Sequence, residues 1–600
     1  MKIKHFAALI IFGLVGAGAA GAATLTMPVG QVKPGMKGKG RSVFRGAEIQ
    51  EFDAEILGVI ENSRPKRNII LARLSGMGLE NTGVIQGMSG SPVYTDGKLI
   101  GAVAYSFAFA KEPIAGLTPI GEMLAISGSG QPAGGISVPF GAIQGSLSLD
   151  DLLAMAGGLF ARRDPLAAGG RMLVPIEVPL VFGGFSALAL DRAKSVFPRW
   201  GFFPLSGGAG GAAQSAGRTS AAAIREGDPV AAELVRGDLS VAAVGTVTYV
   251  DGNKILAFGH PLYNLGPVDY AMSRANVLGV VPSLESSFKL AEIGARAGRI
   301  TQDRSVGALG EVGGTPKLIP LSIKLTEGTG AAREYKIEII RDKILGPLLV
   351  NLTVASLLSS EERSYGNMTY ALDGDVFLDN GLSVHLEDMF SGNLDTAGTS
   401  LSGLLTAVVF YLANNEFEEA GIHQIEIRAR ALEEVKFATL ERVWLDKYEA
   451  VPGERIQVRI YYRTFGGQSF QEAVDIDAPP LPVGSEFTLV IADAASMHQL
   501  ETSLYRSQDF VPRSFGQLVR LLNNLRKNNR IYFKMMASKP GLFLKGEEMP
   551  NLPPSIKSMF ASPRATSSPT ELTRSTLKEY QLPIPFVFRG MAAVPVRIKK

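Results

Sequence analysis

The sequence predicts a mainly β protein built from several domains. Short apolar or alternating runs recur along its 600 residues and are separated by glycines and prolines, which is the pattern of strands joined by turns. Residues 93–103 and 247–258 share one arrangement: an apolar run, Asp-Gly and a second apolar run. Asp-Gly in such a place favours a two-residue hairpin. Two similar hairpins indicate two related β-barrels, and a chain of this length is too long for a single core.

Residues 1–22 have the layout of a secretory signal peptide. Two lysines precede an apolar run at residues 6–15, and small residues end at Ala20-Gly21-Ala22, which fits an A-x-A cleavage site. We therefore expect an exported protein, periplasmic or extracellular, that works in the cell envelope. No segment of the mature chain is expected to span a membrane. Prolines and a Gly-Gly pair interrupt the apolar residues 172–190, which we expect to form buried strands.

The composition excludes several classes of function. The chain has 60 Lys and Arg against 57 Asp and Glu, so it has no electrostatic footprint for nucleic acid. It has no cysteine, which excludes a cysteine nucleophile, a thiolate metal site and disulfides. The histidines are not spaced as a metal pair, so we expect no metal and no cofactor. Asp373, Asp375 and Asp379 lack the order of an EF-hand loop and are expected on a solvated turn.

A serine between small residues, closed by proline, is the first candidate for chemistry. It is Ser89, in the segment Gly87-Met88-Ser89-Gly90-Ser91-Pro92, and it should lie on a tight loop just before the first hairpin. The flanking glycines let the backbone turn sharply. The amides of Gly87 and Ser89 could then face the oxygen of an attacked carbonyl, as an oxyanion hole does. The hexapeptide alone is equally consistent with a turn whose serine only caps backbone groups.

A histidine at the end of the second hairpin is the candidate base. His260 lies between Gly259 and Pro261, and a strand-end position of this kind suits a general base. The other histidines of the mature chain are expected to be structural, two in strands and one at the start of a polar helix. They are His385, His423 and His498.

Together, the serine and histidine segments resemble the SpoIVB-type serine peptidases. The matching residues are 83–92 with the hairpin 97–103, and 245–248 leading to 257–260. The resemblance implies a chymotrypsin-like double β-barrel and an endopeptidase that acts on a protein or peptide substrate. It assigns the nucleophile to Ser89 and the base to His260, and it extends over about the first half of the chain.

Two features depart from that family. The family has its histidine segment before its serine segment, whereas the order here is reversed. The family's acidic residue lies shortly before the serine, and residues 74–77 contain no carboxylate. Asp269 and Asp303 are the alternatives for that role. These departures leave a second function open, a non-catalytic envelope binding or scaffold protein that keeps a peptidase-like fold.

The expected domain organisation places accessory domains after the peptidase region. The expected units are a signal peptide at 1–22; a peptidase region at 23–316, with a serine half at 27–126, a linker and helix at 127–170, a histidine half at 171–316 and a flexible Gly/Ala/Ser-rich loop at 206–223; a β-rich accessory domain at 317–428; a small β-sandwich at 429–500; and a helix, a linker and a terminal strand at 501–600.

Two further expectations concern contacts with proteins. The C-terminal half is expected to dock an envelope protein partner, cover the peptidase core or present substrates. Residues 112–120 contain two prolines and could form an edge strand that pairs with an extended peptide, or a plain loop.

Overall fold

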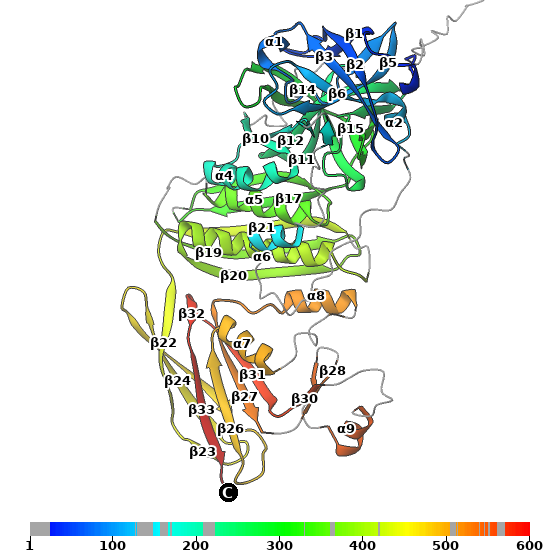
Figure 1. Ribbon diagram of the computed structural model, residues 1–600. Helices are drawn as coiled ribbons and strands as arrows, with labels where there is room; N and C mark the ends of the chain where they lie inside the picture. The colour runs from blue at the N-terminus through cyan, green and yellow to red at the C-terminus, as the bar shows by residue number, and fades with distance from the viewer. Residues whose placement is uncertain are drawn as a thin grey trace, which may run out of the picture.

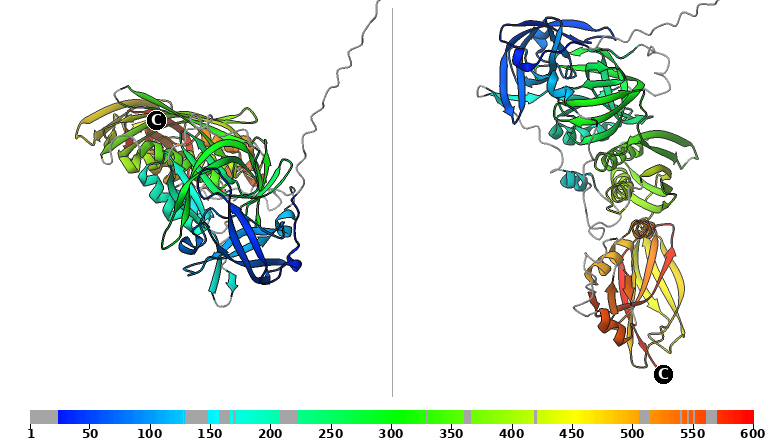
Figure 2. Two further views of the ribbon diagram at one scale, coloured as in Figure 1. Left: turned by 90° about the horizontal axis from the view of Figure 1, so that it is seen from above. Right: turned by 90° about the vertical axis from the view of Figure 1, so that its right-hand side faces the viewer.

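The computed structural model describes residues 24–126, 128, 148–156, 166–168, 171–207, 223–328, 330–359, 366–417, 421–504, 512, 514–538, 541–544, 547–549, 552–560 and 570–600. The protein is mainly β, as predicted, and its units follow one another along an elongated molecule (Figure 1). Two β-barrels at one end are followed by a sheet covered by two helices and then by a β-sandwich (Figure 2, right). The predicted signal peptide lies outside the described residues, as do most of the linker 127–170 and all but the ends of the loop 206–223.

The first barrel is a closed ring of six strands in the order β1-β2-β3-β6-β5-β4. The predicted hairpin joins β4 to β5, and its turn residues Asp96 and Gly97 both have positive φ, which a type I′ turn requires. The elements are β1 (Lys37–Ser42), β2 (Gln50–Arg64), β3 (Arg67–Ser75), α1 (Leu79–Thr82), β4 (Pro92–Thr95), β5 (Lys98–Phe107), β6 (Ile114–Pro119) and α2 (Ile120–Leu124).

The expectation of an edge strand or a loop at residues 112–120 was wrong. Strand β6 lies inside the sheet, between β3 and β5. Its two prolines, Pro113 and Pro119, lie just before the strand and at its last position, so the residues between them can pair on both sides.

The second barrel repeats the first. Its six strands close in the equivalent order, β11-β12-β13-β16-β15-β14, which confirms the expected double barrel. The turn of its hairpin is Gly252-Asn253, one residue later than the Asp-Gly turn that the sequence predicted. The strands are β11 (Pro229–Gly237), β12 (Ser240–Asp251), β13 (Lys254–Ala257), β14 (Gly266–Val281), β15 (Phe288–Arg304) and β16 (Gly307–Val312).

A crossover connects the two barrels and adds a strand to each. Strand β8 pairs with β5 of the first barrel, and β9 pairs with β12 of the second. The predicted buried strands in residues 172–190 are therefore present, although the end of that range forms a helix. The elements between the barrels are α3 (Leu149–Ala156), β7 (Leu166–Ala168), β8 (Arg171–Pro175), β9 (Val178–Gly183), α4 (Ala187–Val196), a 3-10 helix (Phe197–Trp200) and β10 (Phe202–Gly207).

The middle unit extends the sheet of the second barrel. Strand β18 pairs with β11, and five strands continue the sheet in the order β18-β17-β21-β19-β20. Helices α5 and α6 pack against each other beside this sheet. Among the described helices, α6 is long and apolar enough to cross a membrane, but 78% of its apolar window is buried inside the protein. The elements are β17 (Leu318–Thr326), β18 (Ala332–Ile340), α5 (Leu345–Ser359), β19 (Asn367–Leu378), β20 (Ser383–Asn393), α6 (Leu394–Ala413) and β21 (Ile422–Leu432).

The C-terminal unit is a β-sandwich that is larger than the sequence predicted. Its two sheets, β25-β24-β22-β32 and β23-β33-β26-β27-β31, enclose one apolar core, and they include strands from beyond residue 500. The helix predicted within residues 501–600 corresponds to α8, and the predicted terminal strand is β33. The elements are β22 (Phe437–Leu445), β23 (Glu449–Ala450), β24 (Arg455–Thr464), β25 (Ser469–Asp477), β26 (Glu486–Ala492), α7 (Ala494–Leu504), α8 (Phe515–Asn523), β27 (Arg530–Ala537), β28 (Gly541–Leu544), β29 (Glu547–Met549), α9 (Pro554–Phe560), β30 (Thr570–Leu572), β31 (Ser575–Pro583), β32 (Val587–Arg589) and β33 (Met591–Ile598).

Candidate active site

The serine loop is a tight turn between α1 and β4. The amide of Gly90 donates to the carbonyl oxygen of Val103 on β5 at 2.8 Å, and the amide of Ser91 donates to Met88 at 2.9 Å. Gly87 and Gly90 have φ values of +91° and +94°, which L-residues rarely adopt. A Cβ at Gly90 would lie 2.0 Å from the carbonyl oxygen of Thr246 in the second barrel. The loop therefore needs glycine at this position both for its backbone and for the approach of the second barrel.

Two amides of this loop remain available. Among the described residues, neither Gly87 nor Ser89 donates its backbone N–H to an acceptor. The Oγ of Ser89 likewise has no hydrogen-bond partner there, and the side chain is fully buried. The two amides are the ones that the sequence predicts as oxyanion donors.

The second barrel holds the serine loop by its carbonyl oxygens. Four carbonyl oxygens within residues 86–90 accept hydrogen bonds from strands β12 and β15 of that barrel. The pairs are Lys289 N to Gln86 O at 3.0 Å, Thr246 Oγ1 to Gly87 O at 3.1 Å, Thr246 N to Ser89 O at 2.9 Å and Thr248 Oγ1 to Gly90 O at 2.7 Å. Because these carbonyls are fixed, the conformation of the serine loop depends on the docking of the two barrels.

His260 lies in the connection from β13 to β14, which is topologically equivalent to the connection that carries Ser89. The imidazole is fully buried, and its Nδ1 lies 2.9 Å from the carbonyl oxygen of Pro261. The preceding Gly259 has a φ of +67°, and a Cβ there would lie 3.2 to 3.3 Å from atoms of residues 102–104 on β5. The histidine segment and the serine loop therefore meet on the same stretch of β5.

Of the two carboxylates considered for the acidic role, Asp303 lies at the histidine segment. It is fully buried at the end of β15 and accepts hydrogen bonds from the amides of Leu262 and Tyr263, at 2.8 and 2.6 Å. Burial raises the pKa of Asp303 to about 6, although these hydrogen bonds oppose the shift. Asp269 instead accepts the amide of Lys317 and pairs with Arg299.

A buried lysine beneath the serine loop was not identified from the sequence. Lys289 of β15 donates from Nζ to Ser42 Oγ at 2.8 Å, and Ser42 Oγ lies 2.9 Å from Ser91 Oγ. All three side chains are fully buried, and burial lowers the pKa of Lys289 to about 7. The aliphatic part of Lys289 also packs against Gly87. A lone lysine in a strand gives no sequence signal of burial, because the contact is made with a different barrel.

The other candidates lie elsewhere. His385 and His423 are on β20 and β21, and His498 is on α7, where burial lowers its pKa to about 4. The expectation that Asp373 and Asp375 lie on a turn was wrong, because both are on β19 and both pair with Arg428. Among the described residues, no group of three or more His, Asp or Glu side chains is arranged to hold a metal ion.

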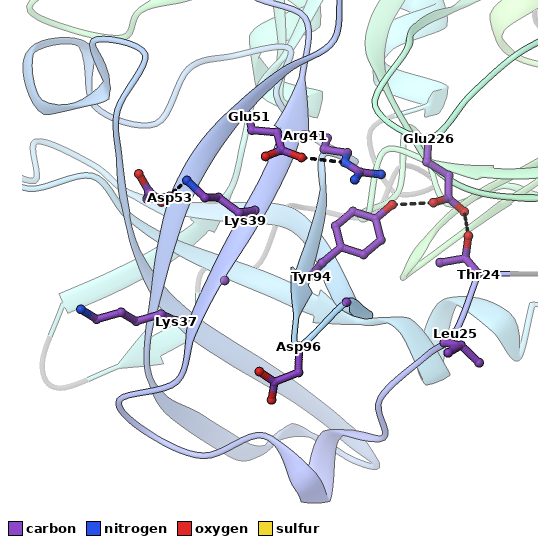
Figure 3. A pocket seen from close by; sticks show the side chains of 12 residues that line it. Thr24, Leu25, Lys37, Lys39, Arg41, Glu51, Asp53, Tyr94, Asp96 and Glu226 are labelled. Carbon is purple, nitrogen blue, oxygen red and sulfur yellow. Dashed lines mark hydrogen bonds and ion pairs between the residues drawn. The ribbon is translucent and has the colours of Figure 1, made fainter.

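A surface pocket of about 600 Å³ lies beside the barrels and not at Ser89 (Figure 3). Two basic side chains that line the pocket form ion pairs, Lys39 with Asp53 and Arg41 with Glu51. Glu226, just before the second barrel, accepts the hydroxyl of Tyr94 on β4. It also accepts the hydroxyl of Thr24 at 2.7 Å. The pocket therefore marks a seam between the barrels, and neither Ser89 nor His260 lines it.

One comparison with known proteins agrees with the serine motif. Residues 2–124 match the family model of the SpoIVB peptidase S55 family. This range includes the serine loop and ends before the histidine segment. A search of curated proteins and a search of solved structures each found no match. The match supports a serine peptidase, with which the double barrel is consistent, and over its first 124 residues the chain is similar to the SpoIVB-type serine peptidases.

Proposed function

We propose that this protein is an exported serine endopeptidase that cleaves a protein of the cell envelope. The observation that carries the proposal is the meeting of two segments on β5: the loop of Ser89 is bonded to Val103, and the residue before His260 packs against residues 102–104. The family match and the layout of residues 1–22 add support.

The proposed reaction assigns a role to each group of the serine and histidine segments. His260 takes the proton from Ser89 Oγ, which attacks the carbonyl carbon of the scissile bond and forms an acyl-enzyme. The amides of Gly87 and Ser89 donate to the oxyanion. His260 then protonates the leaving amine, and water hydrolyses the acyl-enzyme. Asp303 acts as a positioning residue, because its hydrogen bonds fix the backbone that follows His260.

Labelling with a small fluorophosphonate tests this function. The purified mature protein should be phosphonylated on Ser89, and Ser89→Ala should take up no label while retaining the thermal stability of the parent. Export is tested separately by fractionation and N-terminal sequencing, which should place the protein outside the cytoplasm with an N-terminus after Ala22. Absence of label in the folded parent, even after long exposure, would contradict the proposed chemistry.

One observation favours a second function, a binding or scaffold protein. Ser89 and His260 are both fully buried, so a peptide in solution cannot reach them in this conformation. A scaffold would leave the parent unlabelled in every conformation, yet would capture a specific envelope protein through residues beyond 318.

A further inference from the structure

Ser89 is fully buried. Part of the crossover between the barrels, residues 174–177, lies next to the serine loop. One edge of β5 pairs first with β4 and then with the serine loop at Val103. Further along β5, the crossover pairs with the same edge. The amide of Ile176 donates to the carbonyl oxygen of Ala104 at 2.9 Å. Val174 then pairs with Ser106, antiparallel to β5. The crossover therefore bonds to Ala104, the residue next to Val103, and Val103 in turn bonds to the serine loop.

Two side chains of this segment lie at or near the serine loop. Glu177 accepts a hydrogen bond from the side-chain amide of Gln86 at 2.7 Å, and Gln86 immediately precedes Gly87. Ile176 is 2% exposed and belongs to the same buried apolar cluster as Ile85 and Met88. Glu177 is therefore bonded to the residue that precedes Gly87, and the neighbouring Ile176 is buried in the apolar cluster that contains Ile85 and Met88.

We propose that residues 174–177 occupy the substrate groove of this site as a built-in ligand. An extended peptide that adds antiparallel to a sheet edge gains main-chain hydrogen bonds, and pockets for its side chains give specificity. The crossover has that arrangement, with Ile176 buried in the apolar cluster that includes Ile85 and Met88. The groove accordingly takes extended peptides with a branched aliphatic residue at the position of Ile176, and the crossover must leave before such a peptide can bind.

This proposal rests on the proposed function only for the reactivity of Ser89, since the groove is defined by contacts alone. Its first test is the rate of fluorophosphonate labelling of the full chain. Ile176→Ala removes apolar contacts that hold the crossover, so labelling of Ser89 should be about tenfold faster or more. Glu177→Ala, which loses the bond to Gln86, should give a smaller increase. The matched control is Val181→Ala, which is equally buried on β9 of the same crossover but pairs within the second sheet, and it should label like the parent.

The second test measures binding without chemistry. In a chain carrying Ser89→Ala and Ile176→Ala, a fluorescent peptide of residues 172–179 should bind by anisotropy. The same peptide with aspartate in place of isoleucine should bind at least tenfold more weakly. Equal labelling of the parent, Ile176→Ala and Val181→Ala, with equal binding of both peptides, would overturn the proposal and leave the peptidase function intact. Selective peptide binding with no labelling of any variant would support the groove and contradict the peptidase.

Discussion

The backbone N–H of Thr246 donates to the carbonyl oxygen of Ser89 at 2.9 Å, so the candidate nucleophile is held by the barrel that carries the candidate base. The hydroxyl of Thr246 bonds the carbonyl of Gly87 as well. Ser89 and His260 therefore depend on one interface, and changes in that interface should alter reactivity even where they do not touch either residue.

Thr246→Val tests this dependence, because it removes the hydroxyl and keeps the volume. Each lost hydrogen bond should lower the free energy of unfolding by about 1 kcal/mol. Thr369→Val is the control away from the site, since Thr369 is an equally buried strand residue whose hydroxyl bonds the carbonyl of Glu434, the hydroxyl of Ser391 and the amide of Lys436. Both variants should melt at lower temperature, but only Thr246→Val should slow labelling of Ser89, by about tenfold. Equal labelling rates would show that the loop does not need this contact.

Asp303→Asn and Asp269→Asn separate the two candidate carboxylates. Asparagine at 303 presents an NH₂ group to a site built from N–H donors, so the segment after His260 should lose its anchor. We expect labelling of Ser89 to fall by at least tenfold in Asp303→Asn and to stay unchanged in Asp269→Asn. The opposite ranking would assign the role to Asp269, which contacts Arg299 and the amide of Lys317.

Lys289 should make stability depend on pH in the alkaline range. Its pKa is lowered to about 7 by burial, whereas the unfolded chain has the ordinary lysine value of about 10.4. Between these values the unfolded state binds more protons, so the free energy of unfolding should rise with pH from about 7 to 10, by at most about 1.4 kcal/mol per pH unit. Lys289→Met should abolish that rise in urea titrations at pH 7, 8.5 and 10. A parent whose stability is flat over this range would contradict the buried, largely neutral lysine.

The C-terminal unit should be held by charges on β20. Glu387 pairs with Lys527 and with Arg530, the latter at 2.6 Å, and its pKa is lowered chiefly by the hydrogen bond from Lys527. Glu387→Gln should therefore speed limited proteolysis between α8 and β27, and acidification below the usual carboxyl range should do the same in the parent. Glu441→Gln, which breaks an ion pair with Arg463 on the sandwich itself, should leave that cleavage rate unchanged. Neither variant should alter labelling of Ser89.

Local patterns account for what the sequence predicts of the fold. The Asp96-Gly97 hairpin and the strands of the barrels follow from turn chemistry and alternation, both of which act between neighbouring residues. Helix α5 was not predicted because residues 345–358 are buried all round, which leaves no polar face to set a helical period. The sandwich was predicted to end too early in the chain, since several of its strands come from residues 530–598 and no local signal marks their pairing with residues 437–492.

In the candidate site too, the features set by neighbouring residues could be predicted, and the contacts between distant residues could not. The loop of Ser89 is predictable because its glycines meet a local backbone requirement at Gly87 and Gly90. The contacts of Lys289 and Ile176 with that loop join residues far apart in the sequence, so a single sequence does not reveal them. The choice between Asp269 and Asp303 likewise depended on which carboxylate the barrel places at the histidine segment.

The most direct test of the central claim is the rate at which a fluorophosphonate labels Ser89 in His260→Ala, compared with the parent. If His260 is the base that activates Ser89, the rate should fall by at least a hundredfold, and peptide mapping should locate the adduct in the parent on Ser89. An unchanged rate in a folded His260→Ala, or an adduct on Ser91 in place of Ser89, would contradict the account.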